Sequence, residues 1–240
     1  MNAALESIKT KSVNVKNEAI GTITENARSN VRSLVFVALA LWLGLVSFLA
    51  SQGGIVGKPG SPPLPLFLGF AIPLAVFLAA YFGWSRFRAF ILGADLRLVA
   101  AMQAWRWAGL GFLSLYAHGI LPWLFALPAG LGDMAIGVSA PWILLGLIRR
   151  PSFAASRRYV IWNILGITDF VVALSLGTLC SGAFPGITRL VGNVTTSPMT
   201  HLPLVLIPAY MVPFFTMLHF TALFQARQLA RSGKSVSVSQ

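Results

Sequence analysis

Two aspartates stand in the middle of long apolar stretches, where a charged side chain is costly. Asp133 and Asp169 each end a Gly-x-x-Asp motif, and they are two of only three aspartates in the chain. An ionisable side chain inside a membrane-spanning segment commonly serves a proton pathway or balances the charge of a substrate. The alternative is a structural ion pair that fixes the register of the helices. The two carboxylates are therefore the first candidates for chemistry.

Arg106 supplies a positive charge at a similar depth. Each aspartate lies ten residues from the aromatic residue at one end of its apolar run, which is ~15 Å at the rise of an α-helix, and Arg106 lies ~12 Å from the start of its own run. We therefore predict an ion-paired cluster of Arg106 with Asp133 and Asp169. The second carboxylate either leaves one net negative charge or holds a proton.

Small residues accompany both aspartates. Aligned on aspartate, the two stretches share Gly three residues before it, a small residue four after it and Ser six after it. Positions three before and four after a residue share its face of a helix, and small residues on that face allow two membrane helices to approach closely. The pattern favours two antiparallel helices packed through small residues, and it is compatible with an inverted internal repeat.

Two further polar residues lie nearer the predicted cytoplasmic side. Asn163 is ~6 Å from that side, and His219 is ~22 Å from the opposite side by the same helical rise. They can meet below the aspartates and, with Arg106, form a polar track from the cytoplasm to the middle of the membrane. A histidine that is simply hydrogen-bonded to a neighbouring helix is the alternative.

Two prolines interrupt the last apolar run. Pro208 and Pro213 disrupt the hydrogen bonds of the carbonyls four residues earlier, those of Leu204 and Ala209. Freed carbonyls can line a cavity, and the kink can act as a hinge or be static.

A metal or haem site is a secondary hypothesis at the opposite side, where four possible ligands fall near helix ends: His118, Cys180, Met199 and His201. They lack the close spacing of common metal motifs, so no cofactor is predicted. Cys180 is the only cysteine, which excludes an intrachain disulfide. Familiar catalytic motifs are also absent. The sequence leaves open whether the protein is an enzyme and favours that it is not.

The composition is that of an integral membrane protein, with 56% hydrophobic and only 10% charged residues in 240. By the length needed to cross a bilayer, we predict an all-α bundle of six transmembrane helices. Their approximate ranges are 33–51, 66–84, 98–121, 123–148, 159–181 and 203–225. A single broken or re-entrant element in place of the third and fourth spans is the main alternative.

The basic residues predict the orientation. Fifteen of the 18 Lys and Arg residues fall on one side of these spans and two on the other, with Arg106 inside. Basic loops remain in the cytoplasm, so both termini are predicted to be cytoplasmic in a plasma (inner) membrane. No nucleic-acid partner is predicted, because the basic residues form no stripe interleaved with exposed aromatics.

The predicted domains are a polar tail at 1–32, a transmembrane domain at 33–226 and a basic tail at 227–240. Apolar residues recur every four positions in the first tail, which fits an amphipathic helix on the membrane or on a protein partner, or a partly disordered tail. Residues 84–97 are predicted to form a short interfacial helix. Residues 182–202 form either a lid over the bundle or a plain surface loop. The oligomeric state is not predicted.

The functional hypothesis is a small proton-coupled transporter or channel that uses the Asp/Arg cluster. One alternative is a non-catalytic membrane subunit or assembly factor in which the buried charges are structural. Another is a membrane redox or lipid-modifying enzyme that uses the histidines.

Overall fold

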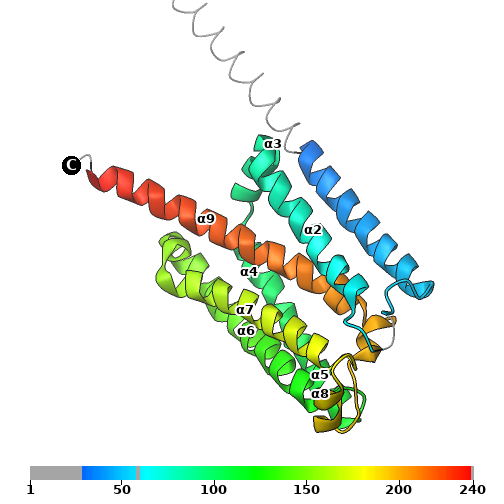
Figure 1. The fold of residues 1–240 in the computed structure, drawn as a ribbon. Helices are drawn as coiled ribbons and strands as arrows, with labels where there is room; N and C mark the ends of the chain where they lie inside the picture. Colours follow the sequence, from blue (N-terminus) through cyan, green and yellow to red (C-terminus); the bar gives the residue numbers. More distant parts are fainter. Residues whose placement is uncertain (1–28, 58–59, 239–240) are drawn as a thin grey trace, which may run out of the picture.

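The computed structural model describes residues 29–57 and 60–238, with side chains up to residue 231, and these residues form helices without any strand. The predicted tail at 1–32 therefore lies mostly outside the described residues. Five helices are long and apolar enough to cross a membrane, and Figure 1 shows them side by side in one bundle. They are Ser29–Ser51, α2 (Leu64–Gly83), α6 (Trp123–Arg149), α7 (Arg157–Leu179) and Ile207–Arg231, which includes most of α9 (Val212–Val238). The predicted all-α class is confirmed, and the five candidate spans are compatible with the predicted membrane protein.

The third predicted span is not one regular α-helix. It consists of α4 (Leu96–Met102), the 3₁₀-helix η1 (Gln103–Gly109) and α5 (Leu110–Ala117), which follow one another without a gap. A 3₁₀ stretch of seven residues is longer than the three or four that are usual. The sequence predicted a continuous helix here, because apolar periodicity does not distinguish a 3₁₀ turn from an α turn.

Glycines bring η1 against α6. A Cβ added to Gly137 would overlap the backbone of Arg106 and Trp107, and one added to Gly109 would lie 2.6 Å from Cβ of Asp133. A Cβ on Gly130 would lie 2.9 Å from the carbonyl oxygen of Gly109. Gly130 and Gly137 of α6 thus pack against η1, whereas Gly132 packs against Asp169 of α7, so the small residues of α6 serve both neighbours and not α7 alone as predicted.

The last long helix begins with a widened turn. The π-helix η4 (Ile207–Met211) precedes α9, so the two interior prolines lie at its start and just beyond its end. The carbonyl of Ala209 accepts a hydrogen bond from the indole of Trp42 in the first helix, with 3.0 Å between the atoms. The carbonyl of Leu204 accepts the N–H of Ile207 at 3.0 Å. Both carbonyls that the prolines were expected to free are therefore occupied.

The segment 84–97 is shorter in helix than predicted. It forms α3 (Ser85–Leu92), a turn and the start of α4, where Asp95 caps the helix by accepting the N–H of Arg97 at 2.8 Å. On α3, Phe87 and Ile91 are buried in one cluster with Phe77. Gln225 of α9 donates to the carbonyls of Ile91 and Ala94, 2.9 Å each, and holds the turn against the bundle.

The loop at 182–202 folds back over the end of α7. It contains α8 (Pro185–Leu190) and the 3₁₀-helix η3 (Ser197–Thr200). The hydroxyl of Thr196 donates to the carbonyl of Gly177 at 2.6 Å, and its N–H to that of Cys180 at 3.0 Å. Met199 and Thr200 are buried. Of the two alternatives that the sequence left open, the packing favours a cover over the bundle.

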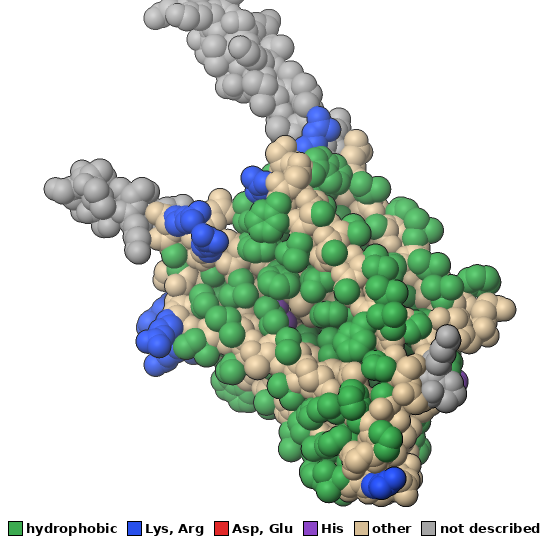
Figure 2. Space-filling model, viewed as in Figure 1, with side chains coloured by type: hydrophobic (Ala, Val, Ile, Leu, Met, Phe, Trp, Pro, Cys, Tyr) green, Lys and Arg blue, Asp and Glu red, His purple; other side chains and the backbone are tan. Residues whose placement is uncertain are grey.

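The molecule has two chemically different ends. Figure 2 shows Lys and Arg side chains gathered along the end where α9 finishes, and one further group at the opposite end. We call the first the basic end; it includes the 3₁₀-helix η2 (Pro151–Ala155) between α6 and α7. We call the second, formed by residues 182–202, the loop end.

The contact between α6 and η1 gives a stability prediction. We expect Gly137→Ala to lower the free energy of unfolding by about 1–3 kcal/mol, because its Cβ meets backbone that cannot move aside. Gly111→Ala in α5 is the matched control, since a Cβ there meets nothing within 4 Å and alanine favours helix. Thermal unfolding of the purified protein in detergent compares the two. Equal stability of the two variants would contradict the close packing.

Candidate functional site

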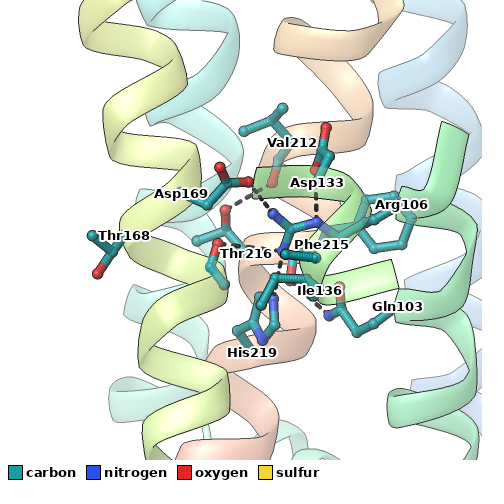
Figure 3. Close-up of polar contacts among 12 residues, drawn as sticks. Gln103, Arg106, Asp133, Ile136, Thr168, Asp169, Val212, Phe215, Thr216 and His219 are labelled. Atoms are coloured by element: carbon teal, nitrogen blue, oxygen red, sulfur yellow. Dashed lines mark hydrogen bonds and ion pairs between the residues drawn. The ribbon is translucent and has the colours of Figure 1, made fainter. Parts of the chain in front are cut away.

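The guanidinium of Arg106 lies at the centre of a polar cluster between η1, α6, α7 and α9 (Figure 3). Its Nε donates to Oδ1 of Asp133 at 2.7 Å, and its Nη2 donates to Oδ2 of Asp169. Its Nη1 donates to the carbonyl of Gly166 at 3.3 Å and lies 3.0 Å from Nε2 of His219. Arg106 is only 3% exposed. The structure therefore brings together the three charged residues that the sequence placed at one depth.

The hydrogen-bond directions fix the state of His219. An arginine only donates, so Nε2 of His219 accepts from Arg106 and the ring proton must be on Nδ1. That Nδ1 donates to Oδ1 of Asn163 at 2.9 Å, and Nδ2 of Asn163 donates to the carbonyl of Tyr159 at 2.9 Å. His219 is thus a neutral imidazole. It belongs to a chain of hydrogen bonds that runs from Arg106 to the carbonyl of Tyr159, in which each group donates to the next. It joins Asn163, as the sequence suggested, and links the pair to Arg106.

Two glycines provide the room for this cluster. A Cβ on Gly166 would overlap the imidazole of His219 and lie 3.1 Å from Nη1 of Arg106. A Cβ on Gly132 would overlap the carboxylate of Asp169. Each Gly-x-x-Asp motif therefore has a steric reason, and in the first motif Gly130 makes room for η1 while Gly132 makes room for the carboxylate of Asp169.

Aromatic rings enclose the cluster from the apolar side. The guanidinium carbon of Arg106 lies 3.9 Å from the centroid of the Phe170 ring, within the range of a cation–π interaction. Trp162 meets His219 edge to face at 5.7 Å between centroids, and its indole N–H donates to Ser139 at 2.8 Å. These contacts hold the imidazole and the guanidinium in fixed orientations.

The carboxylates of Asp133 and Asp169 are more exposed to solvent than the guanidinium of Arg106. The side chains of Asp133 and Asp169 are 16% and 11% exposed, against 2% for that of Arg106. Among the described residues, none hydrogen-bonds the second oxygen of Asp133, and Figure 3 shows this oxygen directed away from Arg106. With both carboxylates ionised the cluster carries one net negative charge, and Asp133 presents part of it outward.

A cavity of about 330 Å³ reaches Asp133 from the loop end. Its walls come from α2, α5, α6 and α7, from the π-turn at Ile207 and Pro208, and from the covering loop at Thr196–Thr200. A smaller cavity of about 130 Å³ reaches Arg106 and Asp133 between η1, α5 and the start of α9. Asp133 therefore belongs both to the ion-paired cluster and to two cavities.

Sequence reasoning missed two groups at this site. The first is Gln103, fully buried one turn before Arg106, whose Nε2 donates to the carbonyl of Phe215 at 3.4 Å while Oε1 has no partner in the described part of the chain. The second is a set of hydroxyls that line the larger cavity: Thr178, Ser181, Thr196, Ser197 and Thr200. In the sequence, these Ser and Thr residues cluster around one predicted helix end, and this clustering could have indicated a polar entrance to a cavity.

The four possible ligands near the loop end have other roles. The exposed His118 and His201 each lie within hydrogen-bond distance of a carbonyl one turn earlier, 2.8 Å from that of Ser114 and 3.1 Å from that of Ser197. Cys180 and Met199 are buried in one hydrophobic cluster. In the described ranges, no three His, Cys, Asp or Glu side chains are placed to hold a metal ion. The two prolines also differ: Pro208 lines the larger cavity, and Pro213 is fully buried within α9.

The fold and the site define a class: an all-helical bundle with five candidate membrane-spanning helices and an ion-paired polar centre. Residues 63–227 match the family described as "Domain of unknown function (DUF8737)", and the chain belongs to that family. The matched region runs from the start of α2 into α9, so it includes the whole cluster and leaves out the first helix. No curated protein and no solved structure matches the chain.

The cluster predicts a pronounced asymmetry between single and combined substitutions. We expect Arg106→Met to lower stability by about 3–5 kcal/mol, because it leaves two buried carboxylates without their cation. The triple variant Arg106→Met, Asp133→Asn, Asp169→Asn removes all three charges and should recover at least about half of this loss. Thermal unfolding in one detergent measures both. A triple variant no more stable than the single one would contradict an electrostatic origin of the effect.

Proposed function

We propose that the protein moves protons or a small solute across a membrane, with Asp133 as the group that binds and releases the transported charge. The dual position of Asp133 carries the proposal, because it is ion-paired with Arg106 and also lines a cavity of about 330 Å³. A purely structural ion pair needs no such access. An intramembrane carboxylate that a solute can reach is typical of proton pathways and of counter-ion sites.

The broken segment supports a sixth crossing. The continuous path of α4, η1 and α5 is about 36 Å long at the rises of the two helix types, enough for a hydrocarbon core of about 30 Å. Six crossings place both ends of the chain on one side. The gathering of Lys and Arg at the basic end supports a cytoplasmic position for that side.

The geometry suggests how access can alternate. The cavity reaches Asp133 from the loop end, and below it Arg106, His219 and Asn163 form a closed, hydrogen-bonded layer. Proton or solute binding at Asp133 weakens its pairing with Arg106, while Asp169 retains the guanidinium. The 3₁₀ segment η1 carries Arg106, and the π-turn η4 lines the cavity. Both are irregular helical segments of the kind found at hinges, so we assign the movement to them and to Pro208 and Pro213.

A non-catalytic subunit with structural charges is the second candidate. The near-complete satisfaction of Arg106 favours it, since four of the five N–H groups have partners and the residue is 3% exposed. In that case Asp133 would be needed for folding and not for flux.

Flux measurements separate the two candidates. We expect Asp133→Asn in reconstituted vesicles to reduce proton flux, driven by a K⁺ diffusion potential and followed with an internal pH dye, by about tenfold or more. The reason is that an amide cannot take up and release a proton. Thr168→Val is the matched control. Thr168 precedes Asp169 in α7 but is exposed, and its hydroxyl donates a hydrogen bond to the carbonyl of Ile164 in the same helix.

In size-exclusion chromatography, Asp133→Asn and Thr168→Val must elute as the same folded species as the wild type. Unchanged flux in the double variant Asp133→Asn, Asp169→Asn would overturn the transport proposal. Loss of the folded species in Asp133→Asn and in Asp133→Glu alike would favour the structural role.

Labelling of introduced cysteines tests the orientation. In a Cys180→Ala background, which removes a fully buried thiol, Ser152→Cys lies exposed at the basic end and Gly186→Cys lies exposed at the loop end. In intact bacterial cells a membrane-impermeant maleimide should label the Gly186→Cys variant and spare the Ser152→Cys variant. Both should react once the membrane is opened. The reverse pattern in intact cells would contradict a cytoplasmic basic end.

A further inference from the structure

We propose that the larger cavity binds a monovalent organic cation with an apolar body, whose positive group lies at the second oxygen of Asp133. This inference rests on the proposed function and names the substrate class of the same site. It follows from three properties of the cavity: its charge, its aromatic walls and its size.

The net charge of the cluster favours a ligand with a single positive charge. Among the described residues that line the cavity, Asp133 is the one that carries a formal charge. Arg106 pairs with one oxygen of Asp133 and one of Asp169, so the cluster retains a single net negative charge when both carboxylates are ionised. One bound positive charge brings the cluster to neutrality, which is the favourable state in a medium of low dielectric constant.

The walls suit a cation that carries apolar groups. Four phenylalanines line the cavity: Phe67, Phe112, Phe125 and Phe170. Phe112 and Phe125 meet edge to face, with centroids 5.5 Å apart and an interplanar angle of 71°. Aromatic faces attract ammonium groups, especially those with apolar substituents, by the cation–π interaction. Small inorganic cations instead require several oxygen ligands, and Asp133 offers one free carboxylate oxygen.

The size and the entrance limit the occupant. A volume of about 330 Å³ is at the lower end of the range for small-molecule sites. Thr178, Ser181 and Thr196 line the part nearest the covering loop. The hydroxyls of Thr178 and Thr196 donate to the carbonyls of Leu174 and Gly177, so towards a ligand they can act only as acceptors. The occupant that fits these walls is a free amine or a quaternary ammonium compound, whose charge pairs with Asp133 and whose apolar groups contact the phenylalanines.

The test compares one cation with its neutral isostere on the full-length protein in detergent. Benzyltrimethylammonium is the probe, and neopentylbenzene has the same shape with carbon in place of the charged nitrogen. We expect saturable binding of the radiolabelled cation in equilibrium dialysis, displaced by unlabelled cation and at least about tenfold less effectively by the isostere. Equal displacement by the two compounds, or no saturable binding, would overturn the inference.

Variants then locate the site. Asp133→Asn should weaken binding about 10–100-fold, whereas Asp133→Glu, which keeps the charge, should retain binding within about tenfold. Phe125→Leu should weaken it about three- to fivefold through loss of an aromatic wall. Phe36→Leu is the matched control, because Phe36 is 65% exposed on the first helix and does not line the cavity. Equal affinity of the wild type and a folded Asp133→Asn variant would contradict the assigned counter-ion.

The binding and flux measurements test the substrate class and the transport proposal separately. If the cation does not bind but proton flux still depends on Asp133, the substrate class is wrong and the transport proposal stands. If the cation binds with the expected dependence on Asp133, but Asp133→Asn changes neither proton flux nor uptake of the radiolabelled cation into vesicles, the site is a binding site and the transport proposal fails.

Discussion

Burial of the Arg106 guanidinium is the constraint on which the arrangement of the bundle depends. A guanidinium removed from water needs partners for its donors and an opposite charge, and here three elements other than its own supply them. Arg106 itself comes from η1, Asp133 from α6, Asp169 and Gly166 from α7, and His219 from α9. None of these helices alone can satisfy the group. The cluster therefore forms only when the four elements meet in one register.

The close approach of these elements is a consequence of glycine. The backbone of η1 passes so near to α6 that Gly137 has no space for a Cβ, and the imidazole of His219 occupies the place where a side chain at Gly166 would lie. The tighter 3₁₀ winding accompanies this approach and places Arg106 between the two aspartates. The ion pairs of Arg106 therefore require the close approach of η1 and α6, and this approach in turn places Arg106 where it can form them.

The sequence predicted the members of the cluster but not the space beside it. Depth along each apolar run was enough to place Arg106, Asp133 and Asp169 in one layer, because helical rise is nearly constant. The 3₁₀ break at η1 was not predictable, since it results from contact with α6 and residues 103–109 contain no local helix breaker apart from Gly109. The cavity was also not predictable, because its walls join α2, α5, α6 and α7 with a loop whose fold depends on the end of α7.

The two aspartates share a sequence motif but differ in their surroundings, and this difference supports the separate roles proposed for them. The carboxylate of Asp169 packs directly on Gly132, where no side chain fits between the helices. Asp133 instead lines both cavities and has an oxygen that faces away from Arg106. The serines that the motif alignment pairs also differ, since Ser139 accepts the Trp162 indole and Ser175 bonds only its own helix. Because Asp169 is fixed and Asp133 is accessible, the first can hold the arginine in place while the second exchanges partners.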